Sequence, residues 1–213
     1  MVSLPPRGCF RLKEITVIDY GMGNLGSVKK AFEYLGYRVV LTSDAAEILK
    51  AESLVLPGVG AFKEAMGRLK LNGKIDALKK KILIEKVPFL GICLGMQLLF
   101  EFSEEGSEKG LGILKGDVKL IPKKQGLKIP HMGWNRIKVK KNSPILKNLD
   151  GEYFYFVHSY FADAEMEDVS SVTEYGGEIT ASVEKGNIFA TQFHPEKSGK
   201  AGLQLLENFG RLL

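Results

Sequence analysis

The chain has 213 residues, 45% apolar and 26% charged, which is typical of a soluble globular enzyme with one substantial core. No apolar stretch reaches the length of a membrane span, and residues 1–14 lack the apolar core of a signal peptide. The net charge is +5, but scattered lysines without interleaved aromatic residues argue against nucleic-acid binding. Two cysteines, Cys9 and Cys93, do not make a disulfide framework, so a reduced, cytoplasmic setting is expected.

The first half of the chain alternates short apolar runs with helical patterns. The apolar runs predict strands at residues 15–19, 37–41, 53–56 and 87–92. Helices are expected at residues 24–35, 44–50, 61–69 and 74–86, with Asn24 and Asp44 as N-caps and Gly36 as a stop. Alternating units of this length predict a parallel sheet that is covered by helices on both faces.

The pattern changes after Ser103, where short β-rich runs replace the alternation. These runs lie at residues 117–121, 135–139, 153–157, 170–175, 178–184 and 188–192. They predict antiparallel strands beside the parallel core, and a helix at about residues 200–213 closes the chain. Without a repeat or a linker, we expect one domain over residues 1–213, with residues 1–14 as an N-terminal extension.

The segment Gly91-Ile92-Cys93-Leu94-Gly95 is the most informative stretch of the sequence, because it lies between a strand and an amphipathic run. Small residues two positions before and after a nucleophile permit the strained strand-to-helix turn that presents its side chain. A thiol in that place also lies at a helix N-terminus, which favours a thiolate. By itself, the pattern also fits a buried cysteine that packs as a small apolar residue.

A second glycine-rich segment, Gly21-Met22-Gly23-Asn24-Leu25-Gly26, matches the dinucleotide fingerprint G-x-G-x-x-G, and Asp44 follows at about the right distance. The alternative is a tight turn or close backbone packing that needs glycine. A nicotinamide enzyme would leave Cys93 and the later His-Pro-Glu segment unexplained. We therefore favour the turn and expect no cofactor and no metal.

The segment Phe193-His194-Pro195-Glu196 directly follows the last predicted strand. Residues two apart in an extended segment point to the same side, so His194 and Glu196 can share one face. A histidine can take the proton of a thiol and return it to a leaving group, and a carboxylate can orient the histidine. His194 and Glu196 are therefore candidates for the base and its orienter beside Cys93.

The loop Pro57-Gly58-Val59-Gly60 supplies a third element at the end of a strand. Its glycines allow backbone N–H groups to approach a substrate closely. One donor from the Gly58–Val59 peptide and one from Leu94 would form an oxyanion hole. Strand ends form the ligand crevice in such sheets, and both this loop and Cys93 are expected there.

These three segments, in this order and with this wide separation, resemble the signatures of the class I (triad) glutamine amidotransferases. The resemblance covers nearly the whole chain and implies a flavodoxin-like fold, a doubly wound, mainly parallel α/β sheet with additional antiparallel strands. It implies that Cys93 attacks the side-chain amide of glutamine, with His194 as base and acid and Glu196 as orienter. It also implies a set of glutamine-binding residues, namely Gly58, Gly60, Gln97, His158, Ser159 and Tyr160.

Three further segments, residues 18–24, 130–135 and 155–160, are similar to the glutaminase subunits of imidazole glycerol phosphate synthase. This similarity implies a heterodimer with a separate (β/α)₈-barrel cyclase, which uses the ammonia in histidine biosynthesis. Trp134 and Asn135 become candidates for the partner face. Tyr155 and Lys197 are further candidates because they lie next to the His158 and His194 motifs.

Three alternatives stay open at this point. The chain could serve another synthase, such as those that make anthranilate, p-aminobenzoate or pyridoxal phosphate, which should lack the segment at residues 130–135. It could be a non-catalytic glutaminase-like module that regulates a partner, although the complete set of Cys93, His194 and Glu196 argues against that. It could also be a cysteine peptidase on a related sheet.

Overall fold

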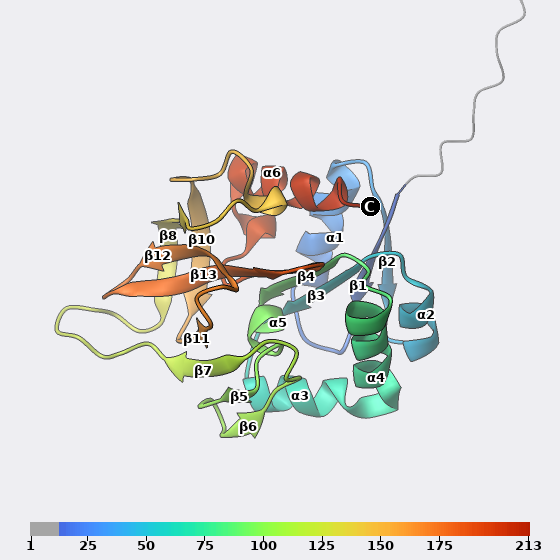
Figure 1. Cartoon of the computed structure of the whole chain (residues 1–213), viewed down its shortest axis with the longest axis horizontal. Helices are drawn as coiled ribbons and strands as arrows, with labels where there is room; N and C mark the ends of the chain where they lie inside the picture. Colours follow the sequence, from blue (N-terminus) through green and yellow to red (C-terminus); the bar gives the residue numbers. More distant parts are fainter. Residues whose placement is uncertain (1–12) are drawn as a thin grey trace, which may run out of the picture.

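The computed structural model describes residues 13–213, so Cys9 and most of the expected N-terminal extension lie outside the described residues. A central sheet has the strand order β2-β1-β3-β4-β14-β13-β12-β9 (Figure 1). Its strands are β1 (Glu14–Ile18), β2 (Arg38–Thr42), β3 (Leu54–Gly58), β4 (Phe89–Cys93), β9 (Lys138–Val139), β12 (Val169–Glu174), β13 (Glu178–Lys185) and β14 (Ile188–Thr191). The strands from β2 to β14 in this order pair in parallel, and the other three join antiparallel. The predicted fold class is thus confirmed.

Helices cover both faces of this sheet. They are α1 (Leu25–Tyr34), α2 (Ala45–Lys50), α3 (Phe62–Leu69), α4 (Lys74–Lys79) and α6 (Gly199–Gly210). Along β3, Val55 packs in one apolar cluster with α1 and α6, whereas Leu54 and Leu56 pack in the other with α2, α3 and α4. This alternation follows from the two-residue period of a strand, and the near-continuous apolar run follows from burial on both faces.

The predicted caps hold the first two helices. The Asn24 side chain accepts from the Ser27 N–H at 3.4 Å, and the Asp44 side chain accepts from the Ala46 N–H at 2.9 Å. Gly36, with φ of +86°, follows the end of α1. The helix expected at residues 74–86 consists of two parts. α4 ends at Lys79, and a π-helical segment at Lys80–Ile84 continues it. Across residues 13–213, every helix is too short or too polar to span a bilayer.

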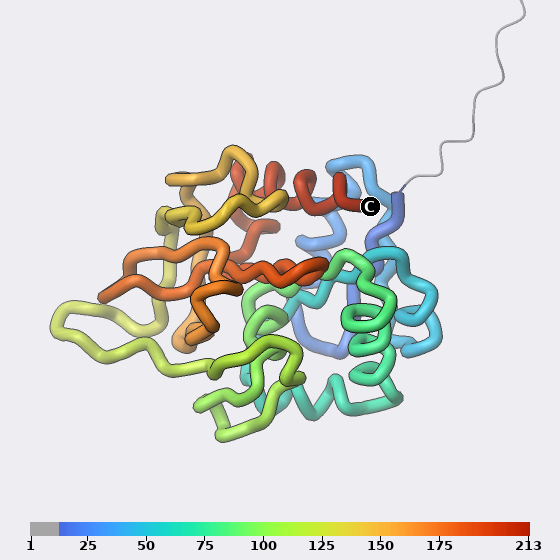
Figure 2. The backbone as a smooth tube through the Cα atoms, in the orientation of Figure 1, coloured from blue at the N-terminus to red at the C-terminus, as the bar shows by residue number. Residues whose placement is uncertain are grey.

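Two small sheets complete the second half of the chain. Their strands are β5 (Phe102–Ser103), β6 (Glu108–Lys109), β7 (Gly116–Leu120), β8 (His131–Arg136), β10 (Tyr153–His158) and β11 (Tyr160–Ala164). β8 pairs only with β10, and the order of the other sheet is β11-β7-β5-β6. The single strand expected at residues 135–139 was wrong: it divides between β8 and β9, which pair in different sheets. The segment between β7 and β8 projects from the body of the molecule (Figure 2).

The C-terminal ends of the central parallel strands meet at one edge of the sheet. Gly58 at the end of β3 pairs with Cys93 at the end of β4, and the neighbouring strand β14 leads into His194. Three segments that are far apart in the sequence therefore converge on one crevice, as expected for a doubly wound sheet.

Candidate active site

Cys93 occupies a strained turn that only small neighbours permit. It is the last residue of β4, has φ of +55°, and directly precedes the short helix α5 (Leu94–Gln97). A Cβ on Gly91 would lie 2.9 Å from the Gly95 carbonyl oxygen, and a Cβ on Gly95 would overlap the Leu56 carbonyl oxygen. A positive φ at a residue other than glycine is costly and typical of functional sites. The elbow predicted from the glycine spacing is therefore present.

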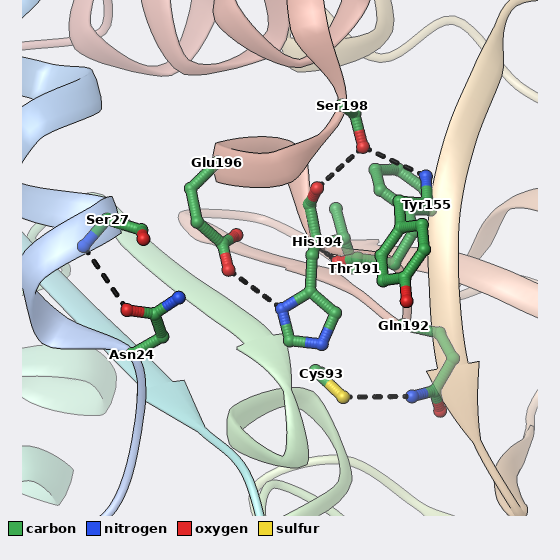
Figure 3. A network of polar contacts seen from close by, with 10 residues as sticks. Asn24, Ser27, Cys93, Tyr155, Thr191, Gln192, His194, Glu196 and Ser198 are labelled. Carbon is green, nitrogen blue, oxygen red and sulfur yellow. Dashed lines mark hydrogen bonds and ion pairs between the residues drawn. The ribbon is translucent and has the colours of Figure 1, made fainter. Parts of the chain in front are cut away.

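His194 and Glu196 lie on the same side, as the spacing predicted. His194 Nδ1 and Glu196 Oε1 are 2.8 Å apart, and both side chains are buried. Figure 3 shows the other ring nitrogen, Nε2, turned toward the Cys93 thiol. Among residues 13–213 this nitrogen has no other hydrogen-bond partner, so it is available to the thiol.

The electrostatics favour a charged imidazole. Burial opposes the charge on His194, but the Cys93 thiolate and the Glu196 carboxylate outweigh it and raise the pKa of His194 above its ordinary value. A thiolate–imidazolium pair is the form in which cysteine acts as a nucleophile.

Several contacts hold the histidine in place. Its backbone N–H donates to the Tyr155 carbonyl at 2.9 Å, and the Ser198 hydroxyl donates to the His194 carbonyl at 2.6 Å. Glu196 lies in the 3₁₀ turn η4 (Pro195–Lys197). α6 packs closely on this turn, since a Cβ on Gly202 would overlap the Pro195 carbonyl oxygen.

Gln192 is a site residue that the sequence analysis missed. It is fully buried, and its Nε2 donates to Cys93 Sγ at 3.6 Å (Figure 3). Its Oε1 accepts from Gln97 Nε2 at 2.9 Å, and Gln97 also donates to the Tyr160 carbonyl at 2.9 Å. The signal was the same two-residue period that joined His194 to Glu196, because Gln192 is the next position back along that face.

The glycine loop after β3 lies next to Cys93 in the sheet. Gly58 is opposite Cys93 in the register of the sheet, and Gly60 has φ of +101°. The segment that imitates a dinucleotide fingerprint packs against this loop. A Cβ on Gly23 would lie 3.5 Å from the Pro57 carbonyl oxygen, and one on Gly60 would lie 2.7 Å from Met22 Cε. Gly21 and Gly23 have φ of +82° and +128°, so they serve the turn before α1, and Asp44 serves as the cap of α2.

A pocket of about 320 Å³ opens onto the thiol. Its wall contains Val59, Gly60, Cys93, Leu94, Gln97, Glu105, Pro130, Val157, His158, Ser159, Tyr160 and His194. All the predicted substrate-binding residues except Gly58 are in this wall. Glu105 was not predicted, and its Oε2 accepts from the Phe62 N–H at 3.0 Å at the start of α3.

Two buried histidines, His158 in the pocket wall and His131 behind it, support this side of the pocket. The Tyr160 carbonyl can only accept, so His158 Nδ1 donates to it at 2.8 Å, and His158 Nε2 accepts from His131 Nδ1 at 3.0 Å. His131 stacks between Phe156 and Tyr175, with ring centroids at 4.7 and 3.8 Å. Burial lowers the pKa of His131 to about 4 and that of His158 to about 3, which keeps both rings neutral at neutral pH.

Three of the four predicted partner-face residues lie together. The rings of Trp134 and Tyr155 meet edge to face with centroids 6.2 Å apart, and Lys197 Nζ lies 5.9 Å from the Tyr155 ring. Asn135 points to the other side of β8, where Nδ2 donates to the Glu174 carbonyl and approaches His131 Nε2 at 3.3 Å. Trp134 is 56% exposed, and Met132, two residues earlier on the same side, is 62% exposed.

Comparison with known proteins agrees with this geometry. The family "Glutamine amidotransferase class-I" matches residues 16–212. The imidazole glycerol phosphate synthase subunit HisH of Caldanaerobacter subterraneus subsp. tengcongensis is 55% identical over 93% of this chain and 98% of its own length. The protein of the same name from Moorella thermoacetica is 48% identical over 95% and 96%.

Solved structures share the fold at low identity. A glutamine amidotransferase has a TM-score of 0.71 at 19% identity over 92% of this chain and 98% of its own. PurLQS from Thermotoga maritima has a TM-score of 0.67 at 21% identity over 94% and 99%. The chain therefore belongs to the class I glutamine amidotransferases and, within them, to the family of the imidazole glycerol phosphate synthase subunit HisH.

Proposed function

We propose that this chain is the glutaminase subunit of an imidazole glycerol phosphate synthase. The observation that carries the proposal is the 55% identity to a HisH subunit along nearly its whole length, together with a thiol, an imidazole and a carboxylate in catalytic order. We also propose a single domain over residues 1–213 and a cytoplasmic location.

The reaction begins at Cys93. Its thiolate attacks the side-chain carbonyl carbon of glutamine, and the negative charge moves to the carbonyl oxygen. The backbone N–H groups of the Gly58–Val59 peptide and of Leu94 would stabilise that oxyanion. Protonated His194 gives its proton to the departing nitrogen, so ammonia leaves and a γ-glutamyl thioester remains.

The second half of the reaction restores the thiol. Neutral His194 removes a proton from water, which attacks the thioester carbon, and the carbon–sulfur bond breaks. Glutamate leaves and the thiolate–imidazolium pair returns. Glu196 keeps the ring of His194 oriented and compensates its charge in both halves.

Glutamine would bind along the pocket wall. Gln97 and the segment His158–Tyr160 have polar groups there, and Gly58 and Gly60 admit the substrate close to the backbone. The network through Gln192 fixes the Gln97 amide before glutamine arrives, which reduces the ordering cost of binding.

We propose that the partner face is the surface around Trp134, Tyr155 and Lys197. Trp134 and Met132 expose large apolar side chains, and Tyr153 on β10 is 48% exposed. Exposed apolar patches mark protein–protein contacts, in which aromatic residues are enriched. The backbone of Tyr155, on β10, accepts a hydrogen bond from the His194 N–H, so β10 connects this surface directly to the catalytic histidine. The expected partner is a (β/α)₈-barrel cyclase that receives the ammonia.

The test is steady-state glutamate release by the full-length subunit alone, with the cyclase, and with the cyclase plus a nucleotide analogue. We expect slow hydrolysis by the subunit alone and strong stimulation in the ternary mixture. Trp134→Ala should reduce the stimulation but not the basal rate. Met166→Ala, at another exposed apolar position that is 92% exposed and lies outside the proposed face, is the matched control and should change neither. Equal rates in all three mixtures would contradict the proposed coupling.

A further inference from the structure

Tyr20 carries a buried hydroxyl that lacks a partner. The residue is 4% exposed, and its oxygen makes no hydrogen bond within residues 13–213. Buried polar groups are nearly always bonded, and an exception needs an explanation. Burial, and then the charge of Cys93, raise the pKa of Tyr20, so the hydroxyl keeps its hydrogen and stays a donor.

This hydroxyl lies directly against the loop that follows β3. A methyl group on Gly58 would overlap the Tyr20 oxygen, and it would also lie 2.9 Å from Leu94 Cβ and 3.1 Å from the Gly95 nitrogen. Tyr20 stands outside the set of residues that line the substrate pocket. Its hydroxyl therefore contacts the junction of Gly58 and α5 from outside the pocket wall.

A peptide unit is planar, so its N–H and C=O point in opposite directions. When the Val59 N–H turns toward the carbonyl oxygen of the substrate, the Gly58 carbonyl must turn away from the pocket. A buried carbonyl in that position needs a donor. The Tyr20 hydroxyl, which has no partner within residues 13–213, is the nearest atom to the Cβ position of Gly58 and is a donor that could serve this carbonyl.

We propose that Tyr20 is a positioning residue for the oxyanion hole, whose hydroxyl donates to the Gly58 carbonyl when the Gly58–Val59 peptide presents its N–H to the substrate. The proposal rests on the proposed glutaminase function. It also explains why a donor is kept unbonded in the resting subunit, because the bond forms only in the catalytic arrangement.

Tyr20→Phe removes one oxygen atom and separates this role from a structural one. We expect kcat for glutamine hydrolysis in the ternary mixture to fall about three- to tenfold, the effect of one ordinary hydrogen bond. KM should stay within about twofold, because the bond forms in the transition state rather than on substrate binding. The thermal midpoint of the subunit should stay equal or rise, since the variant removes an unsatisfied buried group.

Ser143→Ala is the matched control. Ser143 is 2% exposed, and its buried hydroxyl also has no partner within residues 13–213. It precedes the turn at Pro144–Leu146, outside the pocket wall. It should leave kcat unchanged, with a thermal midpoint that stays equal or rises. An unchanged kcat in Tyr20→Phe, or a lowered thermal midpoint, would overturn the role of Tyr20 and leave the triad intact. Absence of glutamate from the wild-type mixture would instead contradict the proposed function, and this inference with it.

Discussion

The two sides of the catalytic pair are built in different ways. The Cys93 side is fixed by sterics, because a side chain at Gly91 would meet the Gly95 carbonyl and one at Gly95 would overlap the Leu56 carbonyl of β3. The His194 side is assembled by hydrogen bonds from Tyr155, Ser198 and Glu196. A steric clash either permits or forbids the backbone position of Cys93, whereas the hydrogen bonds that hold His194 can be removed one at a time. Variants on the two sides should therefore differ in kind as well as in size.

The largest effect is expected at the thiol itself. Cys93→Ala removes the nucleophile without adding volume, so glutamine hydrolysis should disappear while the fold remains. The complex with the proposed cyclase should still convert its nucleotide substrate when ammonium salt replaces glutamine, because free ammonia bypasses the glutaminase site. Glutamate assays and circular dichroism check this, and near wild-type hydrolysis in the variant would remove the triad from the mechanism.

The next effect separates the base from its orienter. His194→Ala should cost on the order of 10⁴- to 10⁶-fold in kcat, as in other nucleophile–histidine pairs. Glu196→Gln should cost less, because the imidazole remains and loses only its charge compensation and part of its orientation. Single-turnover kinetics of both variants give the ranking. An inactive Glu196→Gln beside an active His194→Ala would reverse the two roles.

A substitution at the glycines beside Cys93 should lower the stability of the protein more clearly than it lowers kcat. Gly95→Ala places a methyl group on the Leu56 carbonyl, which moves β3 or α5 and should destabilise the protein by about 3–5 kcal/mol. Gly26→Ala is the control from the glycine-rich segment near the N-terminus, since no atom lies within 4 Å of its Cβ. It should leave urea unfolding unchanged or shift it slightly upward. Equal midpoints for the two variants would show that the elbow tolerates side chains.

This difference also explains what the sequence could predict. The elbow, the caps at Asn24 and Asp44 and the alternation of strands and helices leave local patterns in the sequence, so spacing and periodicity revealed them. The division of residues 135–139 between two sheets depends on partners at β10 and β12. Gln192 was missed because its contacts, Cys93 and Gln97, lie more than 90 residues away in the chain.

The smallest effect concerns the pH dependence of stability. Whether stability rises or falls with pH depends on the direction in which folding shifts the pKa of each histidine. His131 and His158 have folded pKa values below the unfolded value of about 6.5, so the unfolded chain binds more protons. Their contribution to stability is complete above about pH 6.5 and decreases as the pH falls toward 4. His194 has a raised pKa, so its contribution is complete below about pH 6.5 and decreases as the pH rises through the folded value.

His131→Phe isolates one of these terms, because a phenyl ring can keep the stack between Phe156 and Tyr175 without a titrating group. At pH 7.5 the variant should be less stable, since His158 Nε2 loses its donor. As the pH falls from 6.5 toward 4, the difference should move in favour of the variant by up to about 1.4 kcal/mol per pH unit. Urea unfolding of both proteins at several pH values measures it. Parallel stability curves would mean that His131 takes up its proton equally in both states, and that the histidine pair does not hold the pocket wall in its neutral form.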